Sequence, residues 1–148
     1  MPTCPFCSID KERQRVLMEC IYVYVMPSNP RLTLHHLLVI PKRHILYPSE
    51  LRPEERQELF DTVIWFQARI LTSLPGMGCD VRQNLRPFLP EDDVKVDHIH
   101  WHLLPRTRED EIYLKTQVHE KDLFEKGRLP PEVMKQEMAT LRRLLFLP

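Results

Sequence analysis

The sequence contains few glycines and no excess of charge of either sign. Its 148 residues include three glycines against fourteen prolines, which argues against a glycine-rich loop that cradles phosphates through backbone amides. Twenty-one basic residues balance twenty-one acidic residues, so no net field recruits nucleic acid or a membrane surface. Any site for an anionic ligand must therefore be local.

Targeting and membrane signals are also missing. The first residues, Met1-Pro2-Thr3-Cys4, lack the charged-then-apolar order of a secretory signal. No apolar run is long enough to cross a bilayer, and the run at 144–147 is far too short. We therefore expect a cytoplasmic protein without nucleic-acid or membrane partners. Disulfides are rare in that reducing compartment, so the pair Cys4 and Cys7 needs another use.

The pattern of apolar residues predicts an α+β fold, with an antiparallel sheet, one long helix and a C-terminal helical extension. Two long apolar stripes of helical period indicate the helices, and β-branched or aromatic runs indicate the strands. The predicted strands cover 20–26, 34–40, 79–85 and 96–104, the last of which Pro105 stops, and 86–93 is a loop. The predicted helices run from Pro53 to about Pro75-Gly76 and onward from Pro131.

Three histidines alternate with apolar residues in the last predicted strand. Side chains of a strand point alternately to opposite faces, so His98, His100 and His102 share one face and the apolar residues between them can pack on the core. Successive histidines are expected roughly 6–7 Å apart, too far for contact between neighbouring rings.

Such an array suits either of two chemistries. Neutral imidazoles can hold a catalytic metal. Alternatively, one ring can attack phosphorus while the others fix its tautomer and hold the substrate oxygens. A catalytic metal usually needs a further carboxylate or a distant histidine, so the pattern favours the nucleophile without settling the choice.

Three segments resemble signatures of the histidine-triad family. The run from His98 to Leu104 is similar to the motif His-φ-His-φ-His-φ-φ, where φ is apolar. The segment from His36 to His44 resembles a second signature, a histidine-led strand followed by a proline and a basic turn. An N-terminal Cys-x-x-Cys, here Cys4 and Cys7, is typical of the zinc-containing bacterial members. The three segments follow the order of the family.

The resemblance implies a role for several residues. The middle histidine, His100, would be the nucleophile that attacks a nucleotide α-phosphate, and His102 would contact phosphate oxygens. His36 would help to orient the cluster. Residues 1–110 would form the nucleotide-binding catalytic domain, and residues 111–148 a C-terminal helical extension packed on it.

The resemblance also implies a structural zinc ion. Its ligands would be Cys4, Cys7, His44 and His98, two thiolates and two imidazoles that can close a tetrahedral site. No open coordination position for chemistry would remain, so this zinc would hold the N-terminus against the catalytic strand.

The sequence departs from the family pattern at two places, and the second of them concerns substrate binding. His35 replaces the glycine that usually precedes the second signature, and the loop before the triad contains no glycine. The substrate contacts are therefore predicted at other positions, where amide, hydroxyl and cationic side chains are available. These candidates are Ser28, Asn29, Asn84, Arg86 and Lys95.

The resulting hypothesis is a nucleotide hydrolase or transferase that cleaves at the α-phosphate through a covalent nucleotidyl-histidine. Its substrate would be a dinucleoside polyphosphate, a nucleoside phosphoramidate or a similar nucleotide. The alternatives are a non-catalytic, nucleotide-binding regulatory protein and a metal-dependent hydrolase that uses the histidines as ligands. A homodimer formed through the long helix and an adjacent strand is a further implication of the resemblance.

Overall fold

The computed structural model describes residues 4–9, 16–74, 76–91, 95–117, 125 and 127–146. The chain divides into two compact units, Met1–Tyr113 and Leu114–Pro148.

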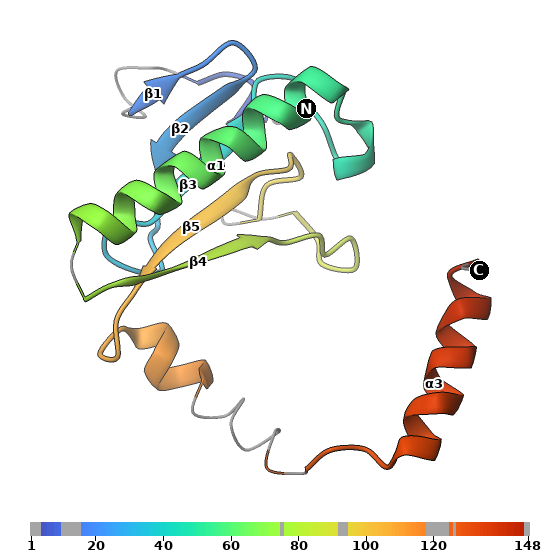
Figure 1. The fold of residues 1–148 in the computed structure, drawn as a ribbon. Coiled ribbons are helices and arrows are strands. Elements are labelled where there is room, and N and C mark those ends of the chain that lie inside the picture. Colours follow the sequence, from blue (N-terminus) through green and yellow to red (C-terminus); the bar gives the residue numbers. More distant parts are fainter. Residues whose placement is uncertain are drawn as a thin grey trace. The chain divides into compact units, whose positions relative to one another are not determined.

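The first unit contains a five-stranded antiparallel sheet and one long helix, which confirms the predicted α+β class (Figure 1). Across the sheet the strands follow the order β1-β2-β3-β5-β4. A short 3₁₀ turn, η1, precedes the helix α1. The elements are β1 Met18–Glu19, β2 Val23–Pro27, β3 Leu37–Pro41, η1 Pro48–Glu50, α1 Pro53–Ser73, β4 Gly78–Gln83 and β5 Trp101–Arg106.

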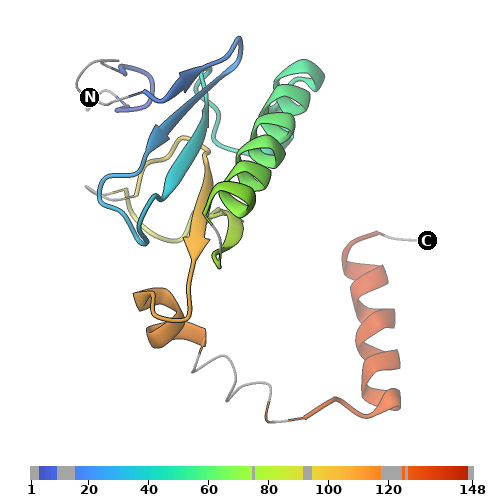
Figure 2. The same ribbon diagram turned by 60° about the vertical axis from the view of Figure 1, so that its left-hand side comes forward.

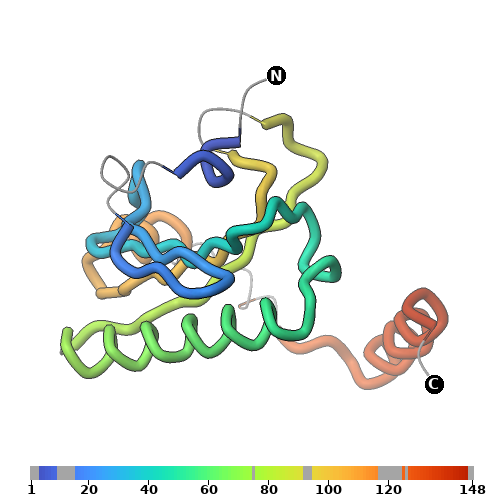
Figure 3. Tube along the Cα trace, turned by 90° about the horizontal axis from the view of Figure 1, so that it is seen from above, coloured from blue at the N-terminus to red at the C-terminus, as the bar shows by residue number. Residues whose placement is uncertain are grey.

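One face of the sheet is covered by α1, and the N-terminal segment lies on the opposite side (Figures 2 and 3). Strand alternation separates the side chains of these two faces. On the helix side, Val25, Val39 and Trp101 occupy one row across the strands and belong to the main core. On the other side, the next row contains Met26, Leu38, His102 and Arg82. The sheet therefore presents its histidine on the face that α1 leaves uncovered.

Helix α1 forms as its sequence predicts. Pro53 begins the helix, and the stripe of Leu59, Val63, Phe66 and Ile70 is buried against the sheet. The helix ends at Ser73, close to the predicted end.

The strands predicted at 34–40 and 79–85 correspond to β3 and β4 with shifted bounds, and the first and last predicted strands differ more from the structure. The strand expected at 20–26 begins only at Val23, as β2, and β1 lies before the predicted range. Between the two strands the carboxylate of Glu58 on α1 accepts hydrogen bonds from the backbone amides of Ile21, Tyr22 and Val23. These amides therefore form a turn around a side chain.

The last strand begins at Trp101 and continues through Pro105, whereas the prediction placed it at 96–104. Pairing of β5 with β3 extends only to Leu103. Beyond that residue one side of β5 is no longer paired, so a residue without an N–H is tolerated.

After residue 110 the described part of the chain forms a π-helical turn and the helix α3. The turn η2 covers Tyr113–Gln117 and α3 covers Pro131–Leu144, which confirms the helix predicted from Pro131. None of the residues of α3 is buried. No helix in the described part of the chain combines the length and apolarity that a membrane span requires. The packing of residues 111–148 on the rest of the chain stays a prediction.

Candidate active site and metal centre

Three histidines form one cluster on the uncovered face of the sheet. His102 belongs to β5, His36 directly precedes β3, and His100 lies just before β5 begins. The ring centroids of His100 and His102 are 4.7 Å apart, and those of His36 and His102 are 5.2 Å apart. The prediction that neighbouring rings stay out of contact is therefore wrong. His100 precedes the regular strand, so the spacing of an ideal strand does not apply to it.

A chain of hydrogen bonds fixes the tautomers of His36 and His102. The backbone N–H of Leu32 donates to Nδ1 of His36 at 3.2 Å, so this nitrogen carries a lone pair. In the neutral ring Nε2 of His36 then carries the proton and donates to Nδ1 of His102 at 2.9 Å. Consequently His102 carries its own proton on Nε2, which is left as a hydrogen-bond donor.

The tautomer of His100 is the opposite one. Its Nδ1 lies 2.8 Å from the carbonyl oxygen of His98. A carbonyl can only accept, so Nδ1 carries the proton and Nε2 carries the lone pair. The cluster therefore places a nucleophilic nitrogen, on His100, beside a neighbouring ring whose free nitrogen is a donor.

Burial keeps these imidazoles neutral. It lowers the pKa of His36 to about 4, with a smaller contribution from the repulsion between His36 and His100 when both are protonated. Burial also lowers the pKa of His102 to about 3, helped by His100, His36 and the guanidinium of Arg82. The pKa of His100 is lowered by burial and partly restored by its hydrogen bond to the carbonyl of His98. Neutral rings are required both for a nucleophile and for the tautomers described above.

The buried, neutral state of His36 predicts a pH dependence of stability. The pKa of an unfolded histidine is about 6.5, and that of His36 in the fold is about 4. The unfolded chain therefore binds more protons between these values, and stability falls as the pH drops. We expect His36→Asn to remove about 1–2 kcal/mol of the decrease in unfolding free energy between pH 6.5 and pH 5.

Urea unfolding at several pH values measures this effect. The matched control is His35→Asn, because His35 is exposed and has a φ of 63° that asparagine readily adopts. The control should keep the wild-type pH dependence. Identical slopes for the two variants would show that His36 does not titrate in this way.

A second cluster lies next to the first and contains two cysteines and two histidines. Cys4, Cys7, His44 and His98 offer one ligand atom each, and these four atoms all lie within 4.8 Å of one another. Sγ of Cys4 is 3.4 Å from Nδ1 of His98, and Sγ of Cys7 is 3.3 Å from Nδ1 of His44. A tetrahedral zinc ion with ordinary bond lengths would separate sulfur and nitrogen ligands by about 3.6 Å. The donor set therefore fits a closed zinc site.

The surroundings of His98 and His44 are suited to ligands. His98 is buried, and its Nε2 donates to the carbonyl oxygen of Pro41 at 2.8 Å, which leaves the lone pair of Nδ1 toward the thiols. The residue before His44, Arg43, is held by two hydrogen bonds to the buried carboxylate of Glu55 on α1. The bonds from Arg43 lower the pKa of Glu55 to about 2, so this pair stays charged. Both histidines are thus positioned by groups outside the cluster.

Phe6 connects the two clusters. Its ring contacts His98 and His100 edge-on, with centroid distances of 5.7 and 5.2 Å. It also packs against the small apolar cluster formed by Met26, Leu38 and Ile40. The segment between the two cysteines therefore covers part of the sheet face next to His100.

The predicted substrate contacts lie in different places. The backbone N–H of Ser28 donates to the carbonyl of His36 at 2.9 Å, which places Ser28 beside the cluster, but its hydroxyl donates to Pro30. Asn29 is exposed in the same turn. Lys95 is paired with Asp97, next to His98.

Asn84 and Arg86 are exposed in the loop after β4. In the described part of the chain, neither side chain contacts the histidines.

Two further findings concern residues next to the site. His35, which stands where the family usually has glycine, adopts a φ of 63° with its side chain exposed. The left-handed conformation is the physical reason for a glycine at this position. Arg82 lies directly beside His102 in the sheet and was not predicted as a site residue.

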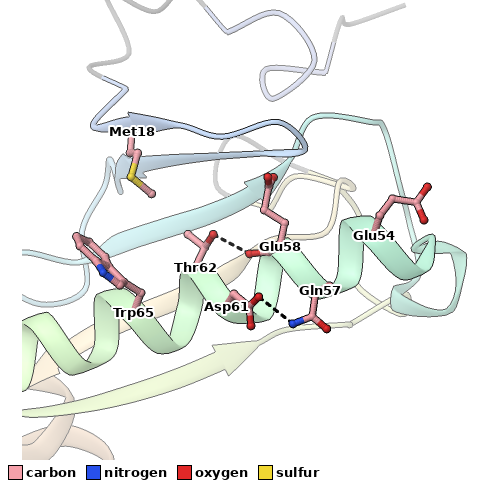
Figure 4. A pocket seen from close by; sticks show the side chains of 7 residues that line it. All are labelled: Met18, Glu54, Gln57, Glu58, Asp61, Thr62 and Trp65. Atoms are coloured by element: carbon pink, nitrogen blue, oxygen red, sulfur yellow. Dashed lines mark hydrogen bonds between the residues drawn. The ribbon is translucent and has the colours of Figure 1, made fainter.

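A hollow with a volume of about 580 Å³ on the described surface lies away from the histidines. It is lined by α1 residues and by Met18 of β1 (Figure 4). Glu58, one of its acidic residues, already holds the turn between β1 and β2. A second hollow, of about 410 Å³, opens at Cys4, Cys7 and His44.

Comparison with known proteins identifies the family. The family model of the HIT domain matches residues 11–109, the larger part of the chain, so the chain belongs to the histidine-triad (HIT) family. This match confirms the resemblance noted in the sequence.

Solved structures agree with this assignment. A histidine triad nucleotide-binding protein from Candida albicans is 22% identical, with a TM-score of 0.60, and the match covers 94% of this chain and 99% of that one. A HIT family hydrolase from Legionella pneumophila is 26% identical, with a TM-score of 0.53 and coverage of 69% and 91%. A zinc-bound histidine triad family protein from Mycobacterium smegmatis is 26% identical, with a TM-score of 0.58 and coverage of 74% and 78%.

Proposed function

We propose that this protein is a nucleotide hydrolase or transferase that cleaves at the α-phosphate through a covalent nucleotidyl-histidine on His100. The observation that carries the proposal is the pair of opposite tautomers. His100 keeps its proton on Nδ1, facing the carbonyl of His98, and so has a free lone pair on Nε2. His102 has a donor on Nε2, because its Nδ1 accepts from His36.

The chemical step follows from these two nitrogens. The Nε2 lone pair of His100 forms a bond to the α-phosphorus while the bond from phosphorus to the leaving group breaks, and the electron pair departs with the leaving group. The positive charge that develops on the imidazole is stabilised through Nδ1–H by the His98 carbonyl. The Nε2–H of His102 donates to a phosphate oxygen. Water, or the hydroxyl of another acceptor, then attacks phosphorus and releases its proton to the solvent, while the P–N bond breaks and its electron pair returns to Nε2 of His100.

The substrate class follows from this reaction and from the family. Dinucleoside polyphosphates and nucleoside phosphoramidates both contain an α-phosphate bonded to a leaving group that can depart with an electron pair. The Legionella relative is named a hydrolase and the Candida relative a nucleotide-binding protein, which supports a nucleotide substrate here.

Trapping of the intermediate tests the proposal. The protein is mixed with diadenosine polyphosphates, adenosine phosphoramidate and their guanosine counterparts, quenched during turnover in alkali, and analysed by intact-mass spectrometry. We expect a mass increase of one nucleotidyl group. Binding without adduct or product would favour the non-catalytic regulatory protein instead.

We further propose that Cys4, Cys7, His44 and His98 hold a structural zinc ion. These four side chains would fill all four coordination positions of the ion, so zinc would supply a tetrahedral cross-link and no open position for chemistry. The zinc-bound relative from M. smegmatis supports this choice of metal. The alternative, a catalytic metal held by the three triad histidines, is disfavoured because His98 turns its Nδ1 to the thiols and its Nε2 to the carbonyl of Pro41. In addition, Nε2 of His102 carries a proton, because its Nδ1 accepts from His36.

A homodimer through α1 and β4 remains part of the proposal. Three apolar side chains of α1, Ile64, Trp65 and Leu71, are between 48% and 61% exposed, and β4 is an edge strand of the sheet. Exposed apolar rows and unpaired edges are features of association surfaces. Light scattering on the purified protein tests this arrangement, because a dimer has twice the 17.8 kDa of one chain.

A further inference from the structure

Arg82 is directly opposite His102 on the uncovered face of the sheet. The register pairs Arg82 of β4 with His102 of β5. Side chains of such a pair share one face, with Cβ atoms about 4.5–5.5 Å apart. The row continues to Leu38 and Met26, which are apolar. Arg82 is therefore the cation that the sheet itself places beside the histidine cluster.

The histidines themselves bring no positive charge to this site. His36 and His102 are held neutral by burial and by the hydrogen bonds that fix their tautomers. A nucleotide phosphate is an anion, and bringing it to a partly buried face costs free energy unless a charged or strongly polar group compensates for its lost hydration. The glycine-free loop from Asn84 to Asp97 argues against a phosphate cradle of backbone amides there. A nearby guanidinium would supply the missing charge.

Neighbouring groups hold Arg82 without using all of its donors. One Nη2 bond of 3.0 Å joins it to the Asp80 carboxylate. The same carboxylate oxygen is shared with Arg106, which is also held by two bonds to Asp110. A guanidinium carries five N–H donors, so most of those of Arg82 are not engaged by Asp80. Its side chain is 38% exposed, whereas that of Arg106 is 8% exposed. Arg106 is thus the buried structural member of this network, and Arg82 the accessible one.

We propose that Arg82 binds the phosphate of the nucleotide beside His102. This inference rests on the proposed function for its substrate class, and it adds a residue that directly contacts the substrate. Asp80 is then a positioning residue, which keeps the guanidinium over the histidine face. The position also explains how a chain without a glycine-rich loop before the triad can hold an anionic substrate.

Paired ligands with and without phosphate provide the test. Binding of AMP, adenosine, GMP and guanosine is measured by calorimetry for wild type, Arg82→Gln, Arg82→Lys and the control Arg56→Gln, whose side chain is exposed on α1. We expect Arg82→Gln to weaken binding of the nucleoside monophosphates about 10- to 100-fold while leaving the nucleosides unchanged. Arg82→Lys should recover part of the loss, because it restores the charge but not the planar fork. Arg56→Gln should behave as wild type.

The outcomes separate this proposal from the proposed function. Equal loss of monophosphate and nucleoside binding in Arg82→Gln, or no loss, would overturn the assignment of Arg82 even if the wild type forms the nucleotidyl adduct. A loss confined to the monophosphates supports Arg82, even if the wild type neither forms an adduct nor turns over. A wild type that binds none of the four ligands would overturn both. Matching thermal unfolding of wild type and Arg82→Gln ensures that folded proteins are compared.

Discussion

Replacement of His100 by asparagine is expected to reduce turnover of an adenylated substrate by about 10⁴-fold or more. Removal of a catalytic nucleophile typically eliminates most of an enzyme's rate enhancement. Asparagine can still donate to the His98 carbonyl that now accepts from Nδ1 of His100. It offers no lone pair suited to attack on phosphorus, so the variant separates the nucleophile from the local structure. Steady-state kinetics on the wild type and the variant measure the loss.

Four controls make the result specific. Binding of AMP and thermal unfolding should remain close to wild type, because His100 is only partly buried and the substitution is smaller than the ring. His35→Asn, at an exposed position outside the cluster, should keep full activity. His102→Asn should lose less rate than His100→Asn, since it removes a donor and not the nucleophile. A variant His100→Asn that retains activity within tenfold of wild type would exclude covalent catalysis at this residue.

Loss of the metal cluster is expected to change the free energy of unfolding more than the substitution of His36 does. In the double variant Cys4→Ser, Cys7→Ser we expect bound zinc to disappear. We also expect the free energy of unfolding to fall by about 3–5 kcal/mol and the midpoint of thermal unfolding by about 10 °C or more. The reason is that the cluster joins the N-terminal segment to His44 and to the segment before β5, across 94 residues between Cys4 and His98. Chelation of the wild type should produce the same change.

Metal analysis and thermal unfolding together test this prediction. Cys20→Ala is the matched control, because Cys20 is a partly buried thiol outside the cluster and its replacement should leave the metal content unchanged. Chelation that abolishes chemistry without altering the unfolding midpoint would instead indicate a catalytic metal. A protein that contains no zinc, and that added zinc does not stabilise, would contradict a structural site.

The periodicity of the sequence determined where the helices lie and which side of α1 is buried. The stripe of Leu59, Val63, Phe66 and Ile70 predicted both α1 and the side of it that is buried, because a helix repeats its faces every 3.6 residues. The proline at 131 predicted the start of α3. The two cysteines and the alternating histidines were recognisable from residue type and spacing alone. Their family resemblance then led to the four residues that the structure gathers within ligand distance.

Tertiary structure decided what depends on residues distant in sequence. The pairing of Arg82 with His102 comes from the register between two strands, and the sequence between them contains no signal for it. The contact of Phe6 with His100 requires the N-terminal segment to fold back over the sheet. The choice between donor and acceptor on each ring follows from the backbone groups that meet it, the amide of Leu32 and the carbonyl of His98. Local patterns encode which residues are apolar and how they repeat, whereas hydrogen-bond direction and register are set only when separate segments of the chain pack together.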